Sequence, residues 1–441
     1  MPTGLRLDLY HLDSAYIAWR AGLNEIATFD LYTRSHPFGG GYMLVAGLEP
    51  ALSFVRDFGY TDDDIAYLRA TKGYDDAFLH ELAQTRFTGE ILAMPEGTVA
   101  FADEPLLRVT GPFREALLLE SGLLHDVNLS TLVATKAARV VTAAAGRPVA
   151  QFGLRRAHAP FPAARAAWIG GCASTSFVEA AKRLDIPATG TIPHALVQAF
   201  DTEEDAFRAV AEALPEFTLL LDTYDVERAI HVAVEVGRDA AQRGHVLRAV
   251  RLDSGDMASQ ARLCRKVLDD AGLTDVRIFA SGDLDEFRIC ELLDDDPPID
   301  ALGVGTSIAV GAGSAERGVE GGSLTCVYKL AWAGRHAAIK QAGAKSTLPG
   351  RKQVWRVGDF DHDLIALEDE TAPPSAHPLL EPVSPQEGAA PLDEIRERAR
   401  EQLEALPGAV RRNVSPDVYR VEHSTALGEL RRTTLRAQGL G

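Results

Sequence analysis

The segment 186–200 places one histidine, His194, between a short apolar stretch that predicts a strand and a pattern that predicts a helix. The edge where a strand meets a helix is where α/β proteins build their sites. An imidazole there could act as a general base, or as a nucleophile that accepts a phosphoryl group. A lone histidine more often only forms structural hydrogen bonds. The residues around His194 therefore decide whether it does chemistry.

Two short stretches that contain glycine predict a site for a phosphate group. Residues 281–283 and 303–306 would each present backbone N–H groups and a hydroxyl at the end of a strand, which suits a phosphate. Short glycine stretches are also common turns, but two on successive units support each other. The candidate phosphate ligands are Ser281, Gly282, Gly303, Gly305 and Thr306.

Charged side chains at the predicted strand ends could bind anions or a metal ion. Arg155, Arg156 and Arg251 carry planar guanidinium groups that bind carboxylate or phosphate oxygens, although each could instead pair with a neighbouring acid. Asp253 and Asp256 could hold Mg²⁺ through water. For Asp256 we prefer a second interpretation, in which it caps a helix.

Two aromatic side chains, Tyr10 and Phe152, could supply faces on which a flat ring stacks. Together with the arginines and the glycine stretches, they indicate a phosphorylated substrate and an anionic or aromatic co-substrate. Residue types and spacing lead no further than this class of ligand.

The elements that would position these residues alternate regularly between strand and helix. The predicted strands are 149–152, 217–221, 246–250, 276–280 and 299–302, and the predicted helices are 175–183, 203–214, 226–243, 259–271 and 284–293. Such alternation requires parallel strands with crossover helices, in a doubly wound sheet or a barrel. The number of units favours a barrel, whose active site would lie at the carboxyl ends of the strands.

The rest of the chain predicts additional modules around this barrel. The expected segments are a mixed α+β domain over 1–112, a helical bridge over 113–147, the barrel over 148–330, strands returning to the first domain over 331–370, and a proline-rich linker, helix and frayed tail over 371–441. We therefore expect an irregular α/β barrel with an α+β domain built from the N-terminal and C-terminal segments.

Composition excludes several classes of protein. With 45 basic and 63 acidic residues, the net charge of -18 disfavours binding to nucleic acid or to an anionic membrane. The four cysteines are widely spaced and predict free thiols rather than a zinc site. The sequence shows no apolar core of a signal peptide and no run of about 18 apolar residues. We expect a soluble cytoplasmic protein.

Many ordered segments resemble nicotinate phosphoribosyltransferase and, more broadly, the type II phosphoribosyltransferases that act on nicotinamide and quinolinate. The matching segments are 8–10, 29–34, 40–42, 46–49, 86–89, 152–157, 190–194, 221–225, 251–256, 281–285 and 303–306, with Glu120 and Asn128. The resemblance covers most of residues 5–425. It departs at 170–175 and at Pro193, where many members carry other residues.

This resemblance implies that nicotinate and phosphoribosyl pyrophosphate form nicotinate mononucleotide and pyrophosphate, with coupled ATP hydrolysis and Mg²⁺, in NAD biosynthesis and salvage. It implies that His194 is transiently phosphorylated, that Arg251 and Thr191 lie near nicotinate, and that Asp253 lies near the Mg²⁺-bound pyrophosphate. It also implies a homodimer with shared active sites, in which the partner subunit supplies Tyr10.

The resemblance assigns further residues to the substrates. They are Tyr10 and Phe152 around the pyridine ring, Arg155 near nicotinate or phosphate, and Arg156, Ser281, Gly282, Gly303, Gly305 and Thr306 around phosphate. Two alternatives stay open: an enzyme specific for nicotinamide or another pyridine, and a member that binds nucleotides without catalysis as a sensor or scaffold.

Overall fold

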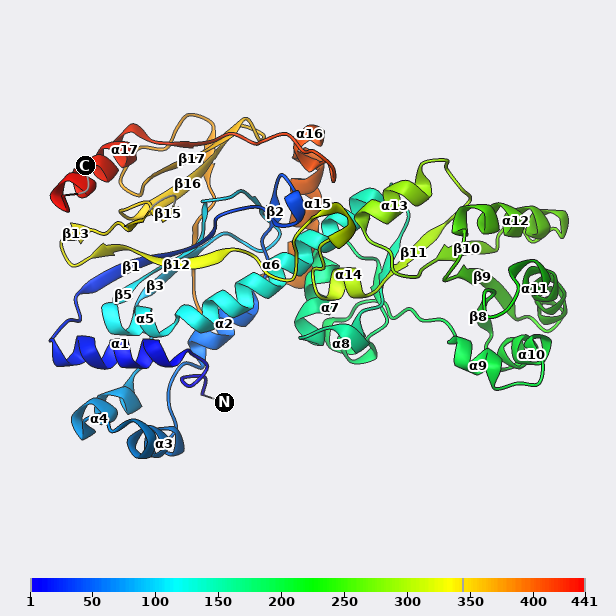
Figure 1. Cartoon of the computed structure of the whole chain (residues 1–441), viewed down its shortest axis with the longest axis horizontal. Helices are drawn as coiled ribbons and strands as arrows, with labels where there is room; N and C mark the ends of the chain where they lie inside the picture. The colour runs from blue at the N-terminus through cyan, green and yellow to red at the C-terminus, as the bar shows by residue number, and fades with distance from the viewer. Residues whose placement is uncertain (1, 343–344, 440–441) are drawn as a thin grey trace. The chain divides into compact units, whose positions relative to one another are not determined.

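The computed structural model describes residues 2–342 and 345–439 of the chain. These residues form two compact units (Figure 1). Unit 1 contains Met1–Thr135 and Val319–Gly441, and unit 2 contains Lys136–Gly318. The first boundary falls within helix α6 (Glu120–Ala143), which with α5 (Phe113–Leu118) occupies the segment expected to be a helical bridge.

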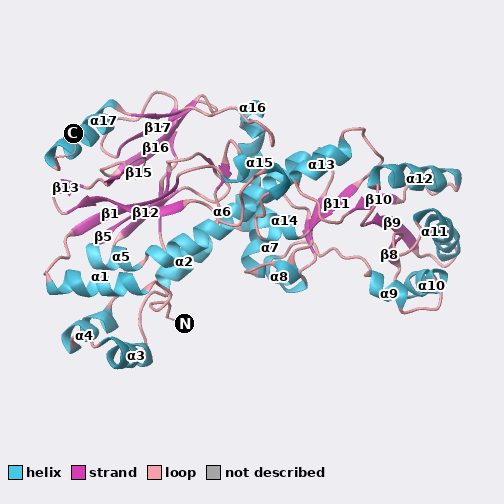
Figure 2. Ribbon diagram, viewed as in Figure 1, coloured by secondary structure: helices cyan, strands magenta, loops and turns pink. Residues whose placement is uncertain are grey.

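Unit 2 is built on a parallel sheet whose strand order is β7-β6-β11-β10-β9-β8. Figure 2 labels four of these strands, β8, β9, β10 and β11. The strands are β6 (Val149–Gln151), β7 (Ser174–Thr175), β8 (Glu216–Leu220), β9 (Val246–Leu252), β10 (Arg277–Ala280) and β11 (Ala301–Val304). The predicted α/β class is confirmed. Among the described strands β7 and β8 are edges, so the predicted barrel is a curled half-barrel.

Helices follow the strands of unit 2 as the alternation predicted. They are η2 (Leu154–Arg156), α7 (Pro160–Ile169), α8 (Val178–Leu184), α9 (His194–Gln198), α10 (Glu203–Ala213), α11 (Val226–Ala241), α12 (Met257–Asp270), α13 (Glu286–Leu293), α14 (Thr306–Ala309) and η3 (Ala315–Arg317). Side-chain caps begin four of them, at Thr202, Asp225, Asp256 and Asp285. The capping role preferred for Asp256 is confirmed by its contact with the Ser259 amide at 3.1 Å.

The prediction of a strand just before His194 is wrong. Only Ala188 forms a bridge, to Thr175 of β7, and the residues between it and α9 have no regular structure. Pro187 and Pro193 flank the segment, and proline has no N–H to donate to a sheet. His194 is therefore the first residue of a short helix that follows an irregular loop.

Unit 1 contains a six-stranded sheet of order β13-β12-β1-β5-β3-β19 and a four-stranded sheet of order β18-β16-β17-β20. The strands of the two sheets are β1 (Ile26–Thr33), β3 (Glu90–Ala93), β5 (Pro105–Pro112), β12 (Cys326–Ala333), β13 (His336–Ala337), β16 (Lys352–Val357), β17 (His362–Leu367), β18 (Ala376–Pro378), β19 (Glu381–Val383) and β20 (Val421–His423). Short pairs are β2 (Met43–Leu44) with β4 (Val99–Ala100) and β14 (Gln341–Ala342) with β15 (Lys345–Ser346).

The remaining elements of unit 1 are helical. They are α1 (Leu9–Arg20), η1 (Pro37–Gly39), α2 (Leu48–Arg56), α3 (Asp62–Lys72), α4 (Asp76–Gln84), α15 (Leu392–Ala405), α16 (Gly408–Arg411) and α17 (Thr425–Ala437). One apolar core joins residues from both ends of the chain, such as Phe54, Leu107, Tyr328 and Ile365. The expected α+β domain made from the two terminal segments is therefore present.

The boundaries at the C-terminal side differ from those expected. Strand β12 pairs antiparallel with β1, with Leu31 opposite Tyr328, so the return to unit 1 begins at Val319 rather than at 331. The proline-rich segment 371–391 is more than a linker, because β18 pairs with β16 and β19 pairs with β3. The basic residues expected in a frayed tail begin within helix α17, and residues 440–441 lie outside the described part.

None of the helices in the described part of the chain is both long enough and apolar enough to cross a membrane.

A half-buried histidine in unit 1, His36, makes the folding stability depend on pH. His36 Nε2 accepts the Ala102 amide at 3.1 Å, and burial lowers the pKa of His36 to about 4, against about 6.5 in an unfolded chain. Because the unfolded chain takes up the proton first, the free energy of unfolding should fall as the pH decreases from about 6.5 towards 4.

Replacing His36 with glutamine keeps an acceptor but removes the titration. Urea unfolding at pH 7, 5.5 and 4 should show that the wild type loses about 3 kcal/mol more than the variant over this interval. The two proteins should respond alike above pH 7. If the wild type and the variant lose the same stability between pH 7 and pH 4, His36 is not the source of the pH dependence.

Candidate active site

A cavity of about 820 Å³ lies in unit 2 at the carboxyl ends of its strands. The sequence-predicted residues that line it are Phe152, Arg155, Arg156, Arg251, Asp253, Ser281, Gly282, Gly303, Gly305 and Thr306. Each of them follows or ends β6, β9, β10 or β11. A second cavity of about 350 Å³ shares four of these residues and adds His194. The two cavities therefore meet at a common wall.

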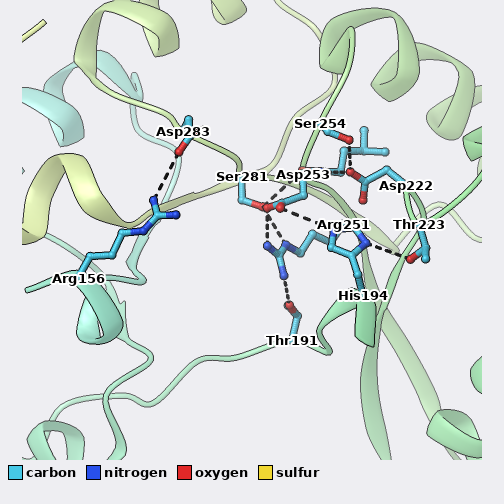
Figure 3. Close-up of polar contacts among 11 residues, drawn as sticks. Arg156, Thr191, His194, Asp222, Thr223, Arg251, Asp253, Ser254, Ser281 and Asp283 are labelled. Atoms are coloured by element: carbon cyan, nitrogen blue, oxygen red, sulfur yellow. Dashed lines mark hydrogen bonds and ion pairs between the residues drawn. The ribbon is translucent and has the colours of Figure 1, made fainter. Parts of the chain in front are cut away.

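Arg251, near the end of β9, forms the centre of the site (Figure 3). Its guanidinium donates to Thr191 Oγ1 at 2.7 Å, to Ser281 Oγ at 2.8 Å and to Asp253 Oδ1. The arginine thus joins the loop before His194 to the ends of β9 and β10. Its Cζ atom lies 6.0 Å from the centroid of the Phe152 ring, so a cation and an aromatic face are adjacent.

Asp253 is held as a carboxylate by its neighbours. Burial acts to raise its pKa, but the hydrogen bond from Ser281 Oγ at 2.5 Å and the charge of Arg251 outweigh burial and lower the pKa below the usual value. The group is consequently ionised at neutral pH. Its other oxygen, Oδ2, lies 3.8 Å from His194 Nε2.

His194 is oriented by the hydroxyl of Thr223, which follows β8. Its Nδ1 lies 3.1 Å from Thr223 Oγ1, and 40% of its side chain is exposed. With Nδ1 engaged, Nε2 remains at the second cavity beside Asp253 (Figure 3). This geometry suits a nucleophilic nitrogen with a carboxylate that can stabilise its charge.

Asp222 is a site residue that the sequence analysis did not assign. It follows β8, and its Oδ2 accepts the Asp253 amide at 3.1 Å and the Ser254 hydroxyl at 2.6 Å. Its Oδ1 is buried and accepts no hydrogen bond. The signal was present, because Asp222 is the polar residue directly after an apolar run, as Asp253 and Ser281 are.

The donor set can be compared with the requirements of Mg²⁺. The described residues contain no group of three or more acidic, histidine or cysteine side chains that could enclose a metal ion. Asp253 and Asp222 nevertheless offer carboxylate oxygens on two residues that are joined by the hydrogen bond from the Asp253 amide to Asp222 Oδ2. Mg²⁺ is commonly bound by one or two carboxylates together with substrate phosphates, so the residues fit a metal that arrives with a phosphorylated substrate.

The glycines predicted to bind phosphate are needed for close backbone packing. Gly282 has φ +97°, and a Cβ there would lie 1.8 Å from the Asp253 carbonyl oxygen. A Cβ at Gly303 would lie 2.6 Å from the Phe152 ring. Beside them, Arg156 Nη1 donates to Thr306 Oγ1 at 2.7 Å and lies 3.8 Å from Asp283 Oδ1. The backbone at Gly282 and Gly303 therefore lies beside a cation, Arg156, and a hydroxyl, that of Thr306.

Two predicted residues differ from the others in their surroundings. Arg155 is exposed in η2 and lines both cavities. Tyr10 belongs to unit 1, where it lies on α1 with 56% of its surface exposed. The assignment of Tyr10 to the pyridine ring stays a prediction.

Three family models and several known proteins match this chain. Residues 5–128 match the nicotinate phosphoribosyltransferase N-terminal domain, 133–311 match the quinolinate phosphoribosyl transferase C-terminal domain, and 375–431 match the nicotinate phosphoribosyltransferase C-terminal domain. Nicotinate phosphoribosyltransferase pncB2 of Mycobacterium tuberculosis is 40% identical over 415 residues, which cover 92% of this chain and 88% of the relative.

Relatives and solved structures extend the comparison. Nicotinate phosphoribosyltransferase of Bacillus subtilis is 40% identical over 388 residues, covering 83% of this chain and 76% of the relative. The crystal structure of human nicotinic acid phosphoribosyltransferase has a TM-score of 0.86 and 29% identity, with 97% of this chain and 99% of that chain covered. The chain therefore belongs to the nicotinate phosphoribosyltransferase family.

Proposed function

We propose that the protein transfers the phosphoribosyl group of phosphoribosyl pyrophosphate to nicotinate and releases pyrophosphate. The pyridine nitrogen forms the new bond to C1 of the ribose as the bond from C1 to the pyrophosphate oxygen breaks. Family membership supports this reaction. The observation that carries it is the contact of Arg251 with Thr191, Ser281 and Asp253 beside the Phe152 ring.

The arrangement meets the needs of such a transfer. The transition state has positive charge at C1 and growing negative charge on pyrophosphate, so the protein must chiefly align the reactants and stabilise charge. Phe152 would stack on the pyridine ring, and Arg155 and Arg251 would attract the nicotinate carboxylate. The 5′-phosphate would bind the backbone at Gly282 and Gly305. These roles use only residues that line the larger cavity.

Mg²⁺ held by Asp253 and Asp222 together with the pyrophosphate oxygens would neutralise charge on the leaving group. Asp253 supports this role because Ser281 and Arg251 hold its pKa low in spite of its burial. The Asp222 side chain would in turn keep the Asp253 backbone in place through the amide contact.

We further propose that ATP phosphorylates His194 at Nε2. The nitrogen would attack the γ-phosphorus as the bond to ADP breaks, and Asp253 Oδ2, 3.8 Å away, would stabilise the positively charged ring. The Thr223 contact at Nδ1 supports this choice of nitrogen, since it leaves Nε2 at the cavity. A phosphorylated histidine would couple ATP hydrolysis to binding of the substrates.

The same proposal includes a homodimer with shared active sites, because Tyr10 is an exposed aromatic residue on α1. Light scattering should then give a particle of twice 47.5 kDa, and a single chain at micromolar concentration would contradict the homodimer.

We propose that the enzyme serves NAD salvage in the cytoplasm. Cell fractionation with an antibody to the chain would test this location.

Product formation from nicotinate and phosphoribosyl pyrophosphate with Mg²⁺, with and without ATP, tests the reaction and the role of His194. We compare the wild type with His194→Ala and with His231→Ala, a control at an exposed histidine on α11. ATP should stimulate the wild type and the His231 variant but leave the His194 variant unchanged.

Each outcome of this assay has a separate meaning. ATP stimulation of His194→Ala would refute the phosphohistidine while the transfer reaction stands. When nicotinamide replaces nicotinate in the same assay, faster product formation from the amide would favour the alternative pyridine specificity. If nicotinate yields no mononucleotide under any of these conditions, the proposed reaction is wrong and the result favours a non-catalytic role.

A further inference from the structure

Unit 1 contains a cavity of its own, with a volume of about 230 Å³. Its wall is formed by residues of β1, β5, β12, β15, β16, β20 and α17, by Asp103 and by the residues between β15 and β16. It shares no lining residue with the two cavities of unit 2. Nothing in the proposed transfer reaction uses it, so the inference below is independent of that reaction.

An acidic side chain with an unused oxygen lines this cavity. Asp30, on β1, is 2% exposed, and its Oδ2 pairs with Lys352 Nζ at 2.7 Å. Its Oδ1 is buried and has no hydrogen-bond partner. Buried polar atoms in folded proteins are almost always hydrogen-bonded. The cavity therefore presents a buried acceptor that a donor from a bound molecule would satisfy.

Lys352 does not compete for such a molecule. Besides Asp30, its ammonium group donates to the Leu348 carbonyl at 2.9 Å and to the Gly350 carbonyl at 2.7 Å. All three of its N–H donors are thus engaged. At this end of the cavity the ion pair is neutral, and the recognition element is the acceptor oxygen of Asp30.

Cationic groups line the same cavity away from this ion pair. Arg431, on α17, donates to the Ser346 hydroxyl at 3.2 Å and has further guanidinium N–H groups to offer. Lys329 also lines the cavity, but its Nζ donates to the Tyr328 carbonyl at 2.9 Å and lies 4.0 Å from Glu120 Oε1. Asp103 lines the cavity as well. The remaining N–H groups of the Arg431 guanidinium therefore favour an anionic group on the ligand.

The remaining walls are apolar or aromatic and suit a small ring. Tyr32, Pro105 and Leu348 supply them. A cavity of roughly 150 Å³ can hold benzene, whereas one water molecule occupies roughly 30 Å³, so this cavity has room for a substituted ring. We propose that it binds a small carboxylate that also carries an O–H or N–H donor, with the donor on Asp30 and the carboxylate on Arg431.

Calorimetric titration of the full-length chain with 3- and 4-hydroxybenzoate tests the site. Nicotinate is kept at saturation so that the cavities of unit 2 are not counted. Benzoate lacks the donor and phenol lacks the carboxylate, so they serve as matched comparisons. At least one hydroxybenzoate should bind with a Kd of about 1 mM or tighter, at least about tenfold tighter than benzoate and phenol.

Variants then locate the binding. Arg431→Leu should weaken the hydroxybenzoate at least about tenfold, whereas Arg432→Leu, an exposed neighbour on the same helix, should not change it. Asp30→Asn should remove the advantage of the hydroxybenzoate over benzoate. If Asp30→Asn does not fold, because Lys352 loses its partner, the Arg431 comparison alone decides.

Three results would overturn the proposal. They are no binding of either hydroxybenzoate to the wild type, equal binding of benzoate, and binding that Arg431→Leu leaves intact. If neither hydroxybenzoate binds, Asp30 Oδ1 accepts hydrogen bonds from water alone. The third would place the hydroxybenzoate elsewhere on the protein.

Discussion

Replacing Arg251 with leucine is expected to lower kcat/KM for nicotinate about 10³-fold. The guanidinium contacts Thr191, Ser281 and Asp253 at once, and preorganised charged donors of this kind contribute about 10²- to 10³-fold each to catalysis. Leucine removes both the attraction for the carboxylate and the clamp between strand ends. Steady-state kinetics with varied nicotinate measure the effect.

A second arginine on the same strand provides the control. Arg248 also lies on β9, but its side chain is 59% exposed and pairs with Glu216 at the surface. Because surface ion pairs contribute little, Arg248→Leu should leave kcat/KM within about twofold of the wild type. Arg251→Lys should recover part of the loss, since it restores the charge without the planar fork. An Arg251→Leu enzyme that keeps a tenth of wild-type kcat/KM would contradict the central role of this residue.

The largest expected effect on stability is that of Glu286→Gln. Glu286, on α13, is fully buried and contacts Lys136 Nζ at 2.5 Å and Arg139 Nε at 3.0 Å, both also buried. Burial lowers the pKa of Lys136, and the charge of Glu286 opposes this. Without the carboxylate, both cations lose this charged partner while they stay buried, so the free energy of unfolding should fall by about 3–5 kcal/mol.

Urea unfolding followed by circular dichroism measures this loss. Glu291→Gln is the matched control, because it lies on the same helix, is 61% exposed and pairs with Arg317 at the surface. The control should change stability by less than about 0.5 kcal/mol. Equal stability of Glu286→Gln and the wild type would show that the buried cations are compensated in another way.

The sequence predicted the site of unit 2 in large part because its residues follow strand ends. Arg251, Asp253 and Ser281 each belong to an apolar run that ends in polar residues, and carboxyl ends of parallel strands meet at one edge of a sheet. Asp222 carries the same signal but was not assigned, since its role is to hold the Asp253 amide and appears only in the contacts. The strand predicted before His194 is absent because Ile186 and Ala188 are apolar but Pro187 and Pro193 have no N–H to donate, which leaves a single bridge at Ala188.

In unit 1 the prediction was less complete, because its sheets are antiparallel and join distant segments. Strand β12 reaches β1 across almost 300 residues of sequence, as the pairing of Leu31 with Tyr328 shows. The segment 371–391 is rich in proline, which predicts a linker, yet it carries two edge strands, where proline is tolerated. No local pattern identifies the partner of such a strand.

By itself the sequence determined the order of strands and helices in unit 2 and the polar residues at their ends, because apolar periodicity and helix caps are local properties. Only the tertiary structure decided which of these ends meet. The strand order β7-β6-β11-β10-β9-β8 sets β9 beside β10, and so Arg251 reaches Ser281 thirty positions away and Thr191 sixty positions away. Contacts of this kind depend on how the sheet packs as a whole, which no window of the sequence contains.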